Sequence, residues 1–459
     1  MYKIKKIIAS EVIDSRGFPT VQTEVWTENN GYGKAIVPSG ASKGEKEAFE
    51  LRDNDKTRFF GKGVLKAVKN VNEKIAPHLI EMDANNQLEI DQKLLLLEEE
   101  EYHQTKLTTN KVFTKNKENL GANAILSVSL AVCLAVASAK KKQLFVHLAE
   151  LCGEKQEEEE VCLPLPMFNI VNGGQHADNN LDFQEFMVLP VGANNLMEGL
   201  EMVNKVFYTL KEDLKSLGFA TGVGDEGGFS TDFNDVYQVF EHLRKAVKKC
   251  QLEEKIVFAM DCAASSFYNK QDGLYHFAGE SKTKNKKVTR KTEELVDYYV
   301  QLVNDFPEIV SIEDPFDEND WMGFQMLSNK LPKHVKVVGD DLFVTNIELL
   351  KQGIEKQAAN TILIKPNQIG TLTETFATIK HALNNDFTVI ISHRSGETED
   401  GFIISDLPVA FQSKRVKLLK TGSIVRGERT AKYNRLLNIE NYLKRTGKKV
   451  IFAGRKALL

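Results

Sequence analysis

Six side chains capable of acid–base or metal-binding chemistry follow short apolar runs in the second half of the sequence. From the second of them onward, they recur at intervals of 25 to 28 residues. A strand, a turn, a helix and a return loop need about this length, since a βα crossover takes a dozen residues or more. The six are Asp261 after IVFAM, Glu313 after IVSI, Asp340 after VKVVG, Lys365 after TILI, His393 after TVIIS and Lys420 after VKLL.

The apolar runs predict parallel strands buried on both faces, because such strands read as continuous rather than alternating hydrophobic segments. In a barrel of parallel strands, the carboxyl ends gather at one mouth, where enzymes of this architecture build their active sites. A polar residue after a single strand can also mark only the start of a loop. Six in succession, with acids first and bases later, instead favour a convergent acid–base and metal site.

Glycine-containing segments add further candidates. VPSGASKGEKEA contains Ser42 in a loop of small residues, where the backbone can approach a ligand closely. NGGQHADNN carries His176 and leads into LDFQEFMVLP, where Gln184 and Glu185 interrupt an apolar run. Burying such a polar pair without partners is costly. Either the pair is functional, therefore, or one of its members faces solvent.

Two more segments place polar side chains beside turns. VGDEGGFS sets Glu226 among glycines, which indicates close approach of backbone and substrate. ISHRSGETED places Arg394 and Ser395 directly after His393, an arrangement suited to an oxyanion or a phosphate group.

Together these segments resemble the enolase (phosphopyruvate hydratase) family over essentially the whole chain. The resemblance is carried by DSRGFPTV, VPSGASKGE, LGANAILSVSLA, NGGQHADNNLDFQEFM, VGDEGGF, MDCAASSFY, SIEDPFDENDW, VGDDLFVTN, ILIKPNQIGT, SHRSGETED and LKTGSIVRGERTAKYN. FGKGV and IKPNQIGT are most similar to enolases of small bacteria such as mycoplasmas. The resemblance implies an α/β protein: an N-terminal α+β lid domain, residues 1–148, followed over residues 149–459 by an enolase-type (β/α)8 barrel with an irregular ββαα start.

The resemblance also implies an activity and its residues. The family are hydro-lyases that reversibly dehydrate 2-phospho-D-glycerate to phosphoenolpyruvate in glycolysis and gluconeogenesis, through an aci-carboxylate intermediate stabilised by two Mg²⁺ per active site. By motif, Lys365 is the base for the C2 proton, and Glu226, supported by Glu185, is the acid at the C3 hydroxyl. The implied metal ligands are Asp261, Glu313 and Asp340, with Ser42 for the second ion. The implied substrate-binding residues are Gln184, His176, His393, Arg394 and Ser395, the last two for phosphate, and Lys420 for the carboxylate.

Elementary electrostatics agrees with these roles. Removing a proton next to a carboxylate creates a dianion, which is unfavourable without nearby positive charge. The attraction between a divalent cation and a unit negative charge about 4 Å away is about 8 kcal/mol at an effective dielectric of about 20, so a metal ion can stabilise this dianion. Lys365 must be neutral to act as a base, and we expect Lys420 and the metal ions to lower its pKa. Glu226 must be protonated to act as an acid, and we expect Glu185 to raise its pKa.

The sequence departs from the family pattern at several positions. They are Lys43, which replaces a small hydroxyl residue beside Ser42, together with Gln175, Ser266, Pro366 and a long connection at 98–119.

Two other functions are open to a chain with this resemblance. A different enzyme of the same superfamily usually carries a Lys-x-Lys pair, whereas this chain reads Lys365-Pro366-Asn367. A non-catalytic binding or structural protein on this fold would be expected to lack Lys365, Glu226 or a metal acid, and all are present.

Composition sets limits on partners and location. The chain has 459 residues, 42% of them hydrophobic, and a net charge of −4, which argues against nucleic-acid binding. The N-terminus does not read as a signal peptide, and the apolar run at 126–139 is too short to span a bilayer, so we expect no membrane insertion. The widely spaced cysteines are typical of reduced thiols in the cytoplasm. The resemblance further implies a homodimer or octamer. It also implies that some of the protein binds plasminogen at the cell surface. The sequence ends in Ala-Leu-Leu rather than in lysine, so it does not support plasminogen binding.

The pattern along the chain places these motifs on expected elements. Residues 1–60 alternate as antiparallel strands do, and residues 64–97 and 121–151 have helical periodicity. The barrel is expected to begin near Val161. Residues 98–119, 154–160 and 279–291 are poor in apolar side chains, and we expect solvated loops there rather than nucleic-acid or partner sites, with 98–119 peripheral to catalysis.

Overall fold

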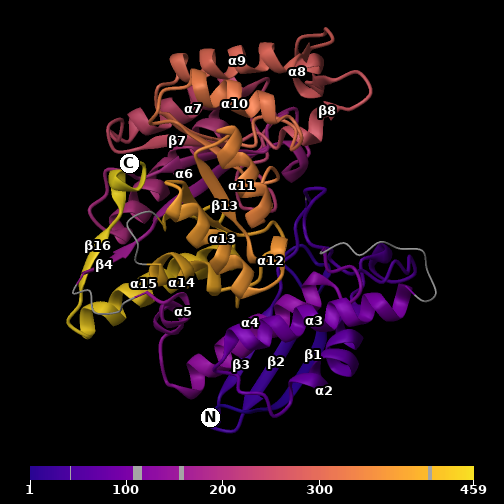
Figure 1. The fold of residues 1–459 in the computed structure, drawn as a ribbon. Helices are drawn as coiled ribbons and strands as arrows, with labels where there is room; N and C mark the ends of the chain where they lie inside the picture. The colour runs from indigo at the N-terminus through magenta and orange to yellow at the C-terminus, as the bar shows by residue number, and fades with distance from the viewer. Residues whose placement is uncertain (42, 107–115, 155–159, 412–415) are drawn as a thin grey trace.

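The computed structural model describes residues 1–41, 43–106, 116–154, 160–411 and 416–459. An N-terminal α+β region lies against one side of a barrel, as Figure 1 shows. Helices α3 (Gln87–Lys106) and α4 (Ala122–Ala139) of the N-terminal region contact α12 (Pro366–Ile369) and α13 (Leu372–Asn384) of the barrel. The connection that contains α12 and α13, between Ile364 and Thr388 of the barrel, therefore faces the N-terminal region.

The N-terminal sheet has the antiparallel strands that the alternating pattern predicts. Its order is β1 (Ile4–Ile13), β2 (Pro19–Thr27) and β3 (Tyr32–Ile36). The alternate residues Val21, Thr23 and Val25 of β2 are fully buried beneath α4. Gly33 lets β3 approach that helix, because a Cβ there would lie 2.0 Å from the carbonyl oxygen of Ala131. The other helical segments described in the region are η1 (Phe59–Gly61), α1 (Leu65–Lys69), η2 (Asn70–Ile75), α2 (Ala76–Leu79) and α5 (Leu144–Cys152).

Helix α4 is longer than the apolar run suggested. Its 18 residues are enough, by length and composition, to cross a membrane, but 83% of this segment is buried inside the protein. Burial rather than length therefore identifies α4 as the core helix of the N-terminal region.

The expected barrel is confirmed, including its irregular start. Eight strands close in the order β11-β12-β13-β14-β15-β5-β6-β7. Strand β6 runs antiparallel to both neighbours, β5 and β7, whereas the other pairs in the barrel are parallel. The strands are β5 (Leu165–Asn172), β6 (Glu185–Leu189), β7 (Val257–Asp261), β11 (Ile309–Glu313), β12 (Lys336–Gly339), β13 (Thr361–Ile364), β14 (Thr388–Ser392) and β15 (Val416–Lys420).

Helices surround the barrel, and several begin at a polar residue whose side chain accepts a hydrogen bond from the first turn. Asn195, Asp235 and Thr371 are such N-caps. Two long helices, α6 (Leu196–Ser216) and α7 (Val236–Lys249), separate β6 from β7 and complete the ββαα start. The others are α9 (Thr292–Asp305), α10 (Trp321–Lys330), α11 (Ile347–Lys356), α14 (Ile403–Ala410) and α15 (Gly427–Arg445).

The expected start of the barrel near Val161 was slightly early. Residues Glu160–Leu163 form β4, which pairs with β16 (Lys449–Phe452) outside the barrel, and the first barrel strand begins at Leu165. The expected division after residue 148 falls inside α5, which packs against α14.

Two segments expected to be solvated loops have ordered structure, so that expectation was wrong for them. In 98–119, helix α3 continues to Lys106, buried Glu98 accepts hydrogen bonds from the backbone N–H groups of Asn119 and Leu120, and buried Lys117 pairs with Glu374 of α13. Residues 107–115 lie outside the described part.

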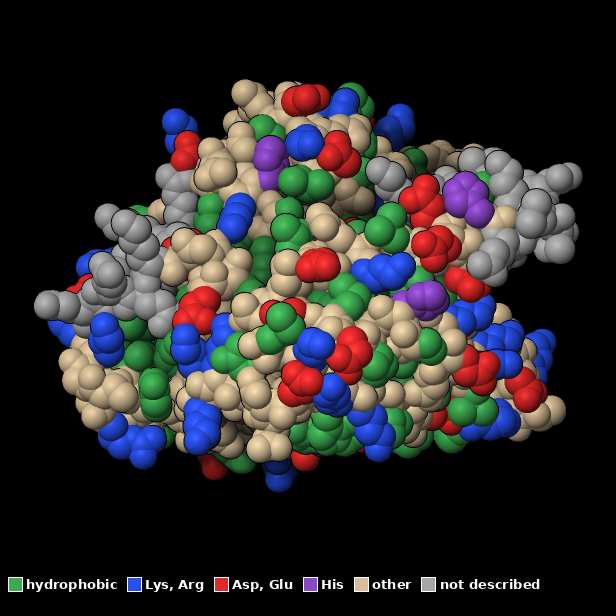
Figure 2. Space-filling view, turned by 60° about the horizontal axis from the view of Figure 1, so that its bottom comes forward, with side chains coloured by type: hydrophobic (Ala, Val, Ile, Leu, Met, Phe, Trp, Pro, Cys, Tyr) green, Lys and Arg blue, Asp and Glu red, His purple; other side chains and the backbone are tan. Residues whose placement is uncertain are grey.

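In 279–291, helix α8 (Ala278–Thr283) is followed by β10 (Thr289–Arg290), which joins a small sheet with β9 (Leu274–His276) and β8 (Tyr268–Asn269). In 154–160, residues 155–159 lie outside the described part. Over the face shown in Figure 2, acidic and basic side chains are interspersed, in keeping with the mixed charge of the sequence.

Candidate active site

The six predicted strand-end residues lie side by side, because their strands are neighbours in the barrel. Three are the last residues of their strands, and three directly follow them. Five are at most 7% exposed, and the Lys365 side chain is 13% exposed. They are Asp261, Glu313 and Lys420 at the ends of β7, β11 and β15, and Asp340, Lys365 and His393 after β12, β13 and β14.

Lys420 lies at the centre of the acidic side chains. Its Nζ is 2.9 Å from both carboxylate oxygens of Glu313 and 3.1 Å from Oδ2 of Asp261. It also lies 3.2 Å from Glu185 Oε1. Gln184 Nε2 donates to the same Asp261 oxygen at 3.2 Å. Acids from three neighbouring strands, β6, β7 and β11, thus share one ammonium group, and Gln184 holds the Asp261 carboxylate among them.

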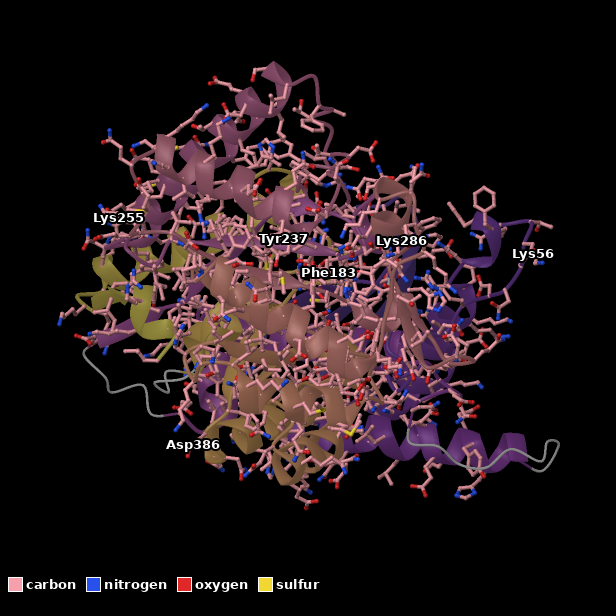
Figure 3. All side chains as sticks on the ribbon, turned by 90° about the horizontal axis from the view of Figure 1, so that it is seen from above. Lys56, Phe183, Tyr237, Lys255, Lys286 and Asp386 are labelled. Carbon is pink, nitrogen blue, oxygen red and sulfur yellow. The ribbon has the colours of Figure 1, made fainter. Side chains whose placement is uncertain are left out.

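Gln184 and Glu185 both face inward, so the alternative that one of them is solvent-exposed is excluded. They are 5% and 2% exposed. The preceding Phe183 is fully buried and lies near the middle of the molecule, whereas Lys255 and Lys56 lie at its edges in this view (Figure 3). Its aromatic neighbours fix the start of β6 and aim the polar pair into the barrel mouth.

Lys365 forms an ion pair with Oδ2 of Asp340. The other oxygen of Asp340 accepts a 2.8 Å hydrogen bond from Gln368, whose own Oε1 accepts from Thr345. Burial by itself would lower the pKa of Lys365, but the charge of Asp340 raises that pKa above its ordinary value. The expected lowering is therefore wrong for the protein alone, because the sequence did not show that Asp340 pairs directly with the base.

Pro366, a departure from the family pattern, suits its position. It is the first residue of α12, where a missing N–H costs nothing. A residue before proline favours extended backbone, and Lys365 has φ −128° and ψ 107°. Pro366 therefore holds the backbone of the candidate base in one conformation.

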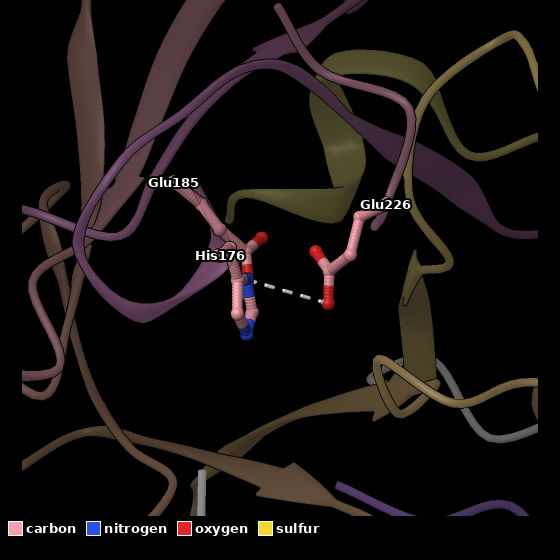
Figure 4. A group of neighbouring side chains, drawn as sticks. All are labelled: His176, Glu185 and Glu226. Carbon is pink, nitrogen blue, oxygen red and sulfur yellow. Dashed lines mark ion pairs between the residues drawn. The ribbon is translucent and has the colours of Figure 1, made fainter. Parts of the chain in front are cut away.

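His176, Glu185 and Glu226 form a second group (Figure 4). Nδ1 of His176 lies 3.7 Å from Glu185 and 3.6 Å from Glu226. Its Nε2 is 3.1 Å from the hydroxyl of Ser395, and burial lowers its pKa. A hydroxyl that donates to Nε2 leaves the imidazole proton on Nδ1, facing both carboxyl groups.

The two carboxyl groups differ in the direction opposite to our expectation. Burial and the charge of Glu226 raise the pKa of Glu185 well above its usual range. Burial also acts to raise the pKa of Glu226, but His176, His393 and Arg429 around it hold that pKa well below its usual range. Glu226 also accepts a hydrogen bond from Asn169, which favours its ionised form.

Arg394 and Ser395 lie where the N-terminal region meets the barrel. Nη1 of Arg394 donates to Glu47 Oε2 at 2.9 Å. The backbone N–H of Ala41 donates to Ser395 Oγ at 3.4 Å, and Ser39 pairs with Gly396 through both backbone groups. The candidate phosphate-binding residues therefore face the loop that carries Ser42.

Ser42, a predicted metal ligand, and Lys43, a departure from the family pattern, are neighbours in the same loop. Ser42 lies outside the described residues. The ammonium group of Lys43 forms an ion pair with Glu50, and its side chain is 45% exposed. Ser266 and Gln175, the other departures, line an open cleft of about 520 Å³ beside the barrel mouth.

Comparison with known families agrees with this geometry. Residues 4–148 match the family described as "Enolase, N-terminal domain", and residues 160–459 match "Enolase, C-terminal TIM barrel domain". The chain belongs to the enolase family. Enolase-family domains imply a lyase that acts on a small molecule with the help of a divalent metal.

The residues of this enolase-family chain fit a divalent cation. One ammonium group, that of Lys420, faces three carboxylates within 3.2 Å. Burial and mutual repulsion raise the pKa of Glu313 well above its usual range. A hard divalent cation on these oxygens would offset the excess negative charge. Asp340 also lies in a group with Asp314 and Asp341 whose ligand oxygens are within 4.8 Å of one another.

Three residues of this site were missed at the sequence level: Glu47, Gln368 and Arg429. Gln368 and Arg429 lie within segments that resemble the family, and Glu47 lies just beyond one, but none of the three directly follows an apolar run. Glu47 in GEKEA reads as a solvated charge. Only the folded structure shows it buried against Arg394.

Proposed function

We propose that this chain catalyses the reversible dehydration of 2-phospho-D-glycerate to phosphoenolpyruvate. The proposal is carried by one observation: a buried lysine, a carboxyl pair that shares a proton, and an ammonium group among acids all meet at the barrel mouth. Such a set can remove a proton next to a carboxylate and then protonate a leaving hydroxyl. The matching substrate has a C2–H bond beside a carboxylate and a hydroxyl group on C3, and 2-phospho-D-glycerate has both.

Lys365 takes the C2 proton in this proposal. Its contact with Asp340 keeps the amine protonated in the protein alone, so the base must first lose that support. A divalent cation, proposed here to be Mg²⁺, would be held by Asp261, Glu313 and Asp340 and would supply positive charge to the substrate carboxylate. The same charge beside Asp340 would lessen the support that this carboxylate gives to the protonated amine. Lys420 binds the carboxylate and stabilises the second negative charge.

Glu226 protonates the C3 hydroxyl as it leaves. The pKa of Glu185 is raised, and Nδ1 of His176 lies within 3.7 Å of both carboxyl groups. A proton on Nδ1 can stabilise whichever carboxylate of the pair is ionised, so the pair can supply its own proton through Glu226. Arg394 and Ser395 bind the phosphate and orient C2 toward Lys365.

The test is the ultraviolet absorbance of phosphoenolpyruvate formed from 2-phospho-D-glycerate by the purified protein with Mg²⁺. The expected result is product formation that stops in excess chelator and returns with added Mg²⁺. A folded protein that forms no product with Mg²⁺ would contradict the proposal, and other 2-hydroxy acids would then be assayed as substrates.

The biological setting follows from the same proposal. The reaction belongs to glycolysis and gluconeogenesis, and we place it in the cytoplasm of a small bacterium, with the chain assembled as a homodimer or as an octamer. The resemblance of FGKGV and IKPNQIGT to bacterial enolases supports the source, and the reduced cysteines support the compartment.

A further inference from the structure

Arg429 is a fully buried arginine that the proposed mechanism leaves without a role. It lies in the first turn of α15, where the helix dipole disfavours a positive charge. Its contacts must therefore account for its position. Nη1 donates to the carbonyl oxygen of Arg394 at 2.8 Å, and Nη2 donates to the carbonyl oxygens of Ser395 at 2.5 Å and Asp225 at 3.1 Å. One guanidinium group thus joins the phosphate-binding loop to the residue before Glu226.

The fourth contact of Arg429 is to an imidazole. Its Nη1 lies 2.5 Å from Nδ1 of His393. A guanidinium group has only donors, so Nδ1 must accept and carry no proton. The single proton of the neutral ring is then on Nε2. This nitrogen lies 3.6 Å from Oε2 of Glu226.

The absence of a side chain at Gly422 leaves space for the stem of this arginine. Gly422 has a φ of +83°, and a Cβ there would lie 2.7 Å from Cδ of Arg429 and 2.9 Å from the carbonyl oxygen of Glu226. Only glycine allows the arginine stem to pass at this distance. The position of the guanidinium group is therefore fixed by packing as well as by its hydrogen bonds.

We propose that Arg429 is a positioning residue that fixes the Nε2–H tautomer of His393 toward Glu226 and holds the Asp225 and Ser395 loops together. The consequence for catalysis rests on the proposed function, whereas the tautomer does not. Arg429 does not touch the reacting atoms. It acts through the imidazole and through the backbone of the two loops. Its loss should therefore change kcat more than KM.

The first measurement is ¹⁵N NMR of protein labelled at histidine, with His393→Gln to assign the His393 signals. The parent protein should show one protonated nitrogen, Nε2, and one unprotonated nitrogen, Nδ1. In Arg429→Met, Nδ1 should gain protonated character, because its fixed donor is gone. An unchanged Nε2–H tautomer in folded Arg429→Met would overturn the proposal, whether or not the protein acts on 2-phospho-D-glycerate.

The second measurement separates positioning from a general loss of stability. Arg429→Met should lower kcat on the order of 10- to 100-fold, as loss of a supporting contact at an active site does, with a smaller change in KM. Arg435→Met is the matched control, since Arg435 lies on the same helix and pairs with Asp406. It should leave kcat and the His393 signals unchanged. Equal losses of kcat in both variants would show a structural role only and overturn the proposal.

Two further variants cover the case in which Arg429→Met does not fold. Arg429→Lys keeps the charge but not the fork, so it should retain part of the tautomer preference and part of kcat. Gly422→Ala displaces the stem without removing the guanidinium group and should shift the His393 signals in the same direction. Parent-like signals in both folded variants would contradict the proposal.

Discussion

The ammonium group of Lys420 lies 2.9 Å from each carboxylate oxygen of Glu313. Burial by itself would lower the pKa of Lys420, but the surrounding acids raise it well above its ordinary value. Lys420 is therefore a fixed positive charge inside the acidic group. It competes with a divalent cation for Glu313 and Asp261, and the same charge is available to a substrate carboxylate.

We predict that Lys420→Met binds Mg²⁺ more tightly than the parent protein when no substrate is present. Removing a unit charge about 4 Å from the ion relieves a repulsion of several kcal/mol at most, so the dissociation constant should fall by about tenfold or more. Titration calorimetry with Mg²⁺ measures it. Lys432→Met, which removes a buried lysine paired with Glu397, is the matched control and should leave Mg²⁺ affinity unchanged. Weaker Mg²⁺ binding by folded Lys420→Met would show that the ion does not share these carboxylates.

Arg394 offers a second prediction, on the phosphate side. Arg394→Lys keeps the charge but loses the planar fork, so phosphate binding should weaken by about 1.5–3 kcal/mol, the range of a charge-assisted hydrogen bond. The KM for 2-phospho-D-glycerate should rise by the corresponding factor, about 10- to 100-fold. Steady-state kinetics measures this change.

Glu47 supplies the comparison for that experiment. Glu47→Gln leaves Arg394 in place but weakens the ion pair that orients it. Its KM should rise less than that of Arg394→Lys. If Arg394→Lys has parent-like kinetics, Arg394 is not a phosphate ligand.

Much of this site could be predicted from the sequence, because a continuous apolar run ending in a polar residue encodes both a strand and its functional end. Asp261 and Lys365 were placed in this way. The antiparallel direction of β6 was expected only from the family resemblance, since an apolar run such as LDFQEFMVLP does not show whether its strand pairs parallel or antiparallel. Glu98 was misinterpreted because the acidic run around it has no apolar periodicity, although its carboxylate binds two buried backbone N–H groups.

The pKa directions at Lys365 and Glu226 were also beyond the sequence. They depend on which charges lie within a few ångströms, and the nearest ones come from other strands. Asp340 is 25 residues away from Lys365, and His393 is 167 residues away from Glu226. Arg429 was missed for the same reason, since four of its partners, Asp225, His393, Arg394 and Ser395, lie at least 34 residues away in sequence.

His147 on α5 gives a prediction for stability against pH. Burial lowers its pKa to about 4, despite Glu150 at 3.6 Å. The unfolded state, with an ordinary value near 6.5, therefore binds more protons between these two pH values. The free energy of unfolding should fall as the pH drops from about 6.5 to about 4, with a contribution from His147 of at most about 3 kcal/mol.

Urea denaturation at several pH values measures this dependence. His147→Gln should flatten the slope in this window, because the glutamine side chain does not titrate. His78→Gln, at an exposed position on α2, is the matched control. Equal slopes in the parent protein and His147→Gln would contradict the assignment.

The last prediction separates the two residues that handle protons. If Lys365 removes the C2 proton and Glu226 assists loss of the C3 hydroxyl, each step can be followed alone. Removing a proton-transfer group typically costs about 10²–10⁴-fold in its own step. Glu226→Gln should block phosphoenolpyruvate formation but still exchange the C2 hydrogen with deuterated water, because Lys365 and the carboxylates that bind cations remain. Lys365→Ala should lose both exchange and dehydration.

Proton NMR of 2-phospho-D-glycerate in deuterium oxide reads the exchange directly. Lys351→Ala, which removes a lysine from the outer helix α11, is the control for general effects and should keep both reactions. Exchange that persists in Lys365→Ala but disappears in Glu226→Gln would mean that the two roles are reversed. Such a reversal is chemically coherent only if Glu226 is ionised, which the pKa direction in this structure allows. The isotope experiment therefore also tests whether the proton rests on Glu185 or on Glu226 when substrate is bound.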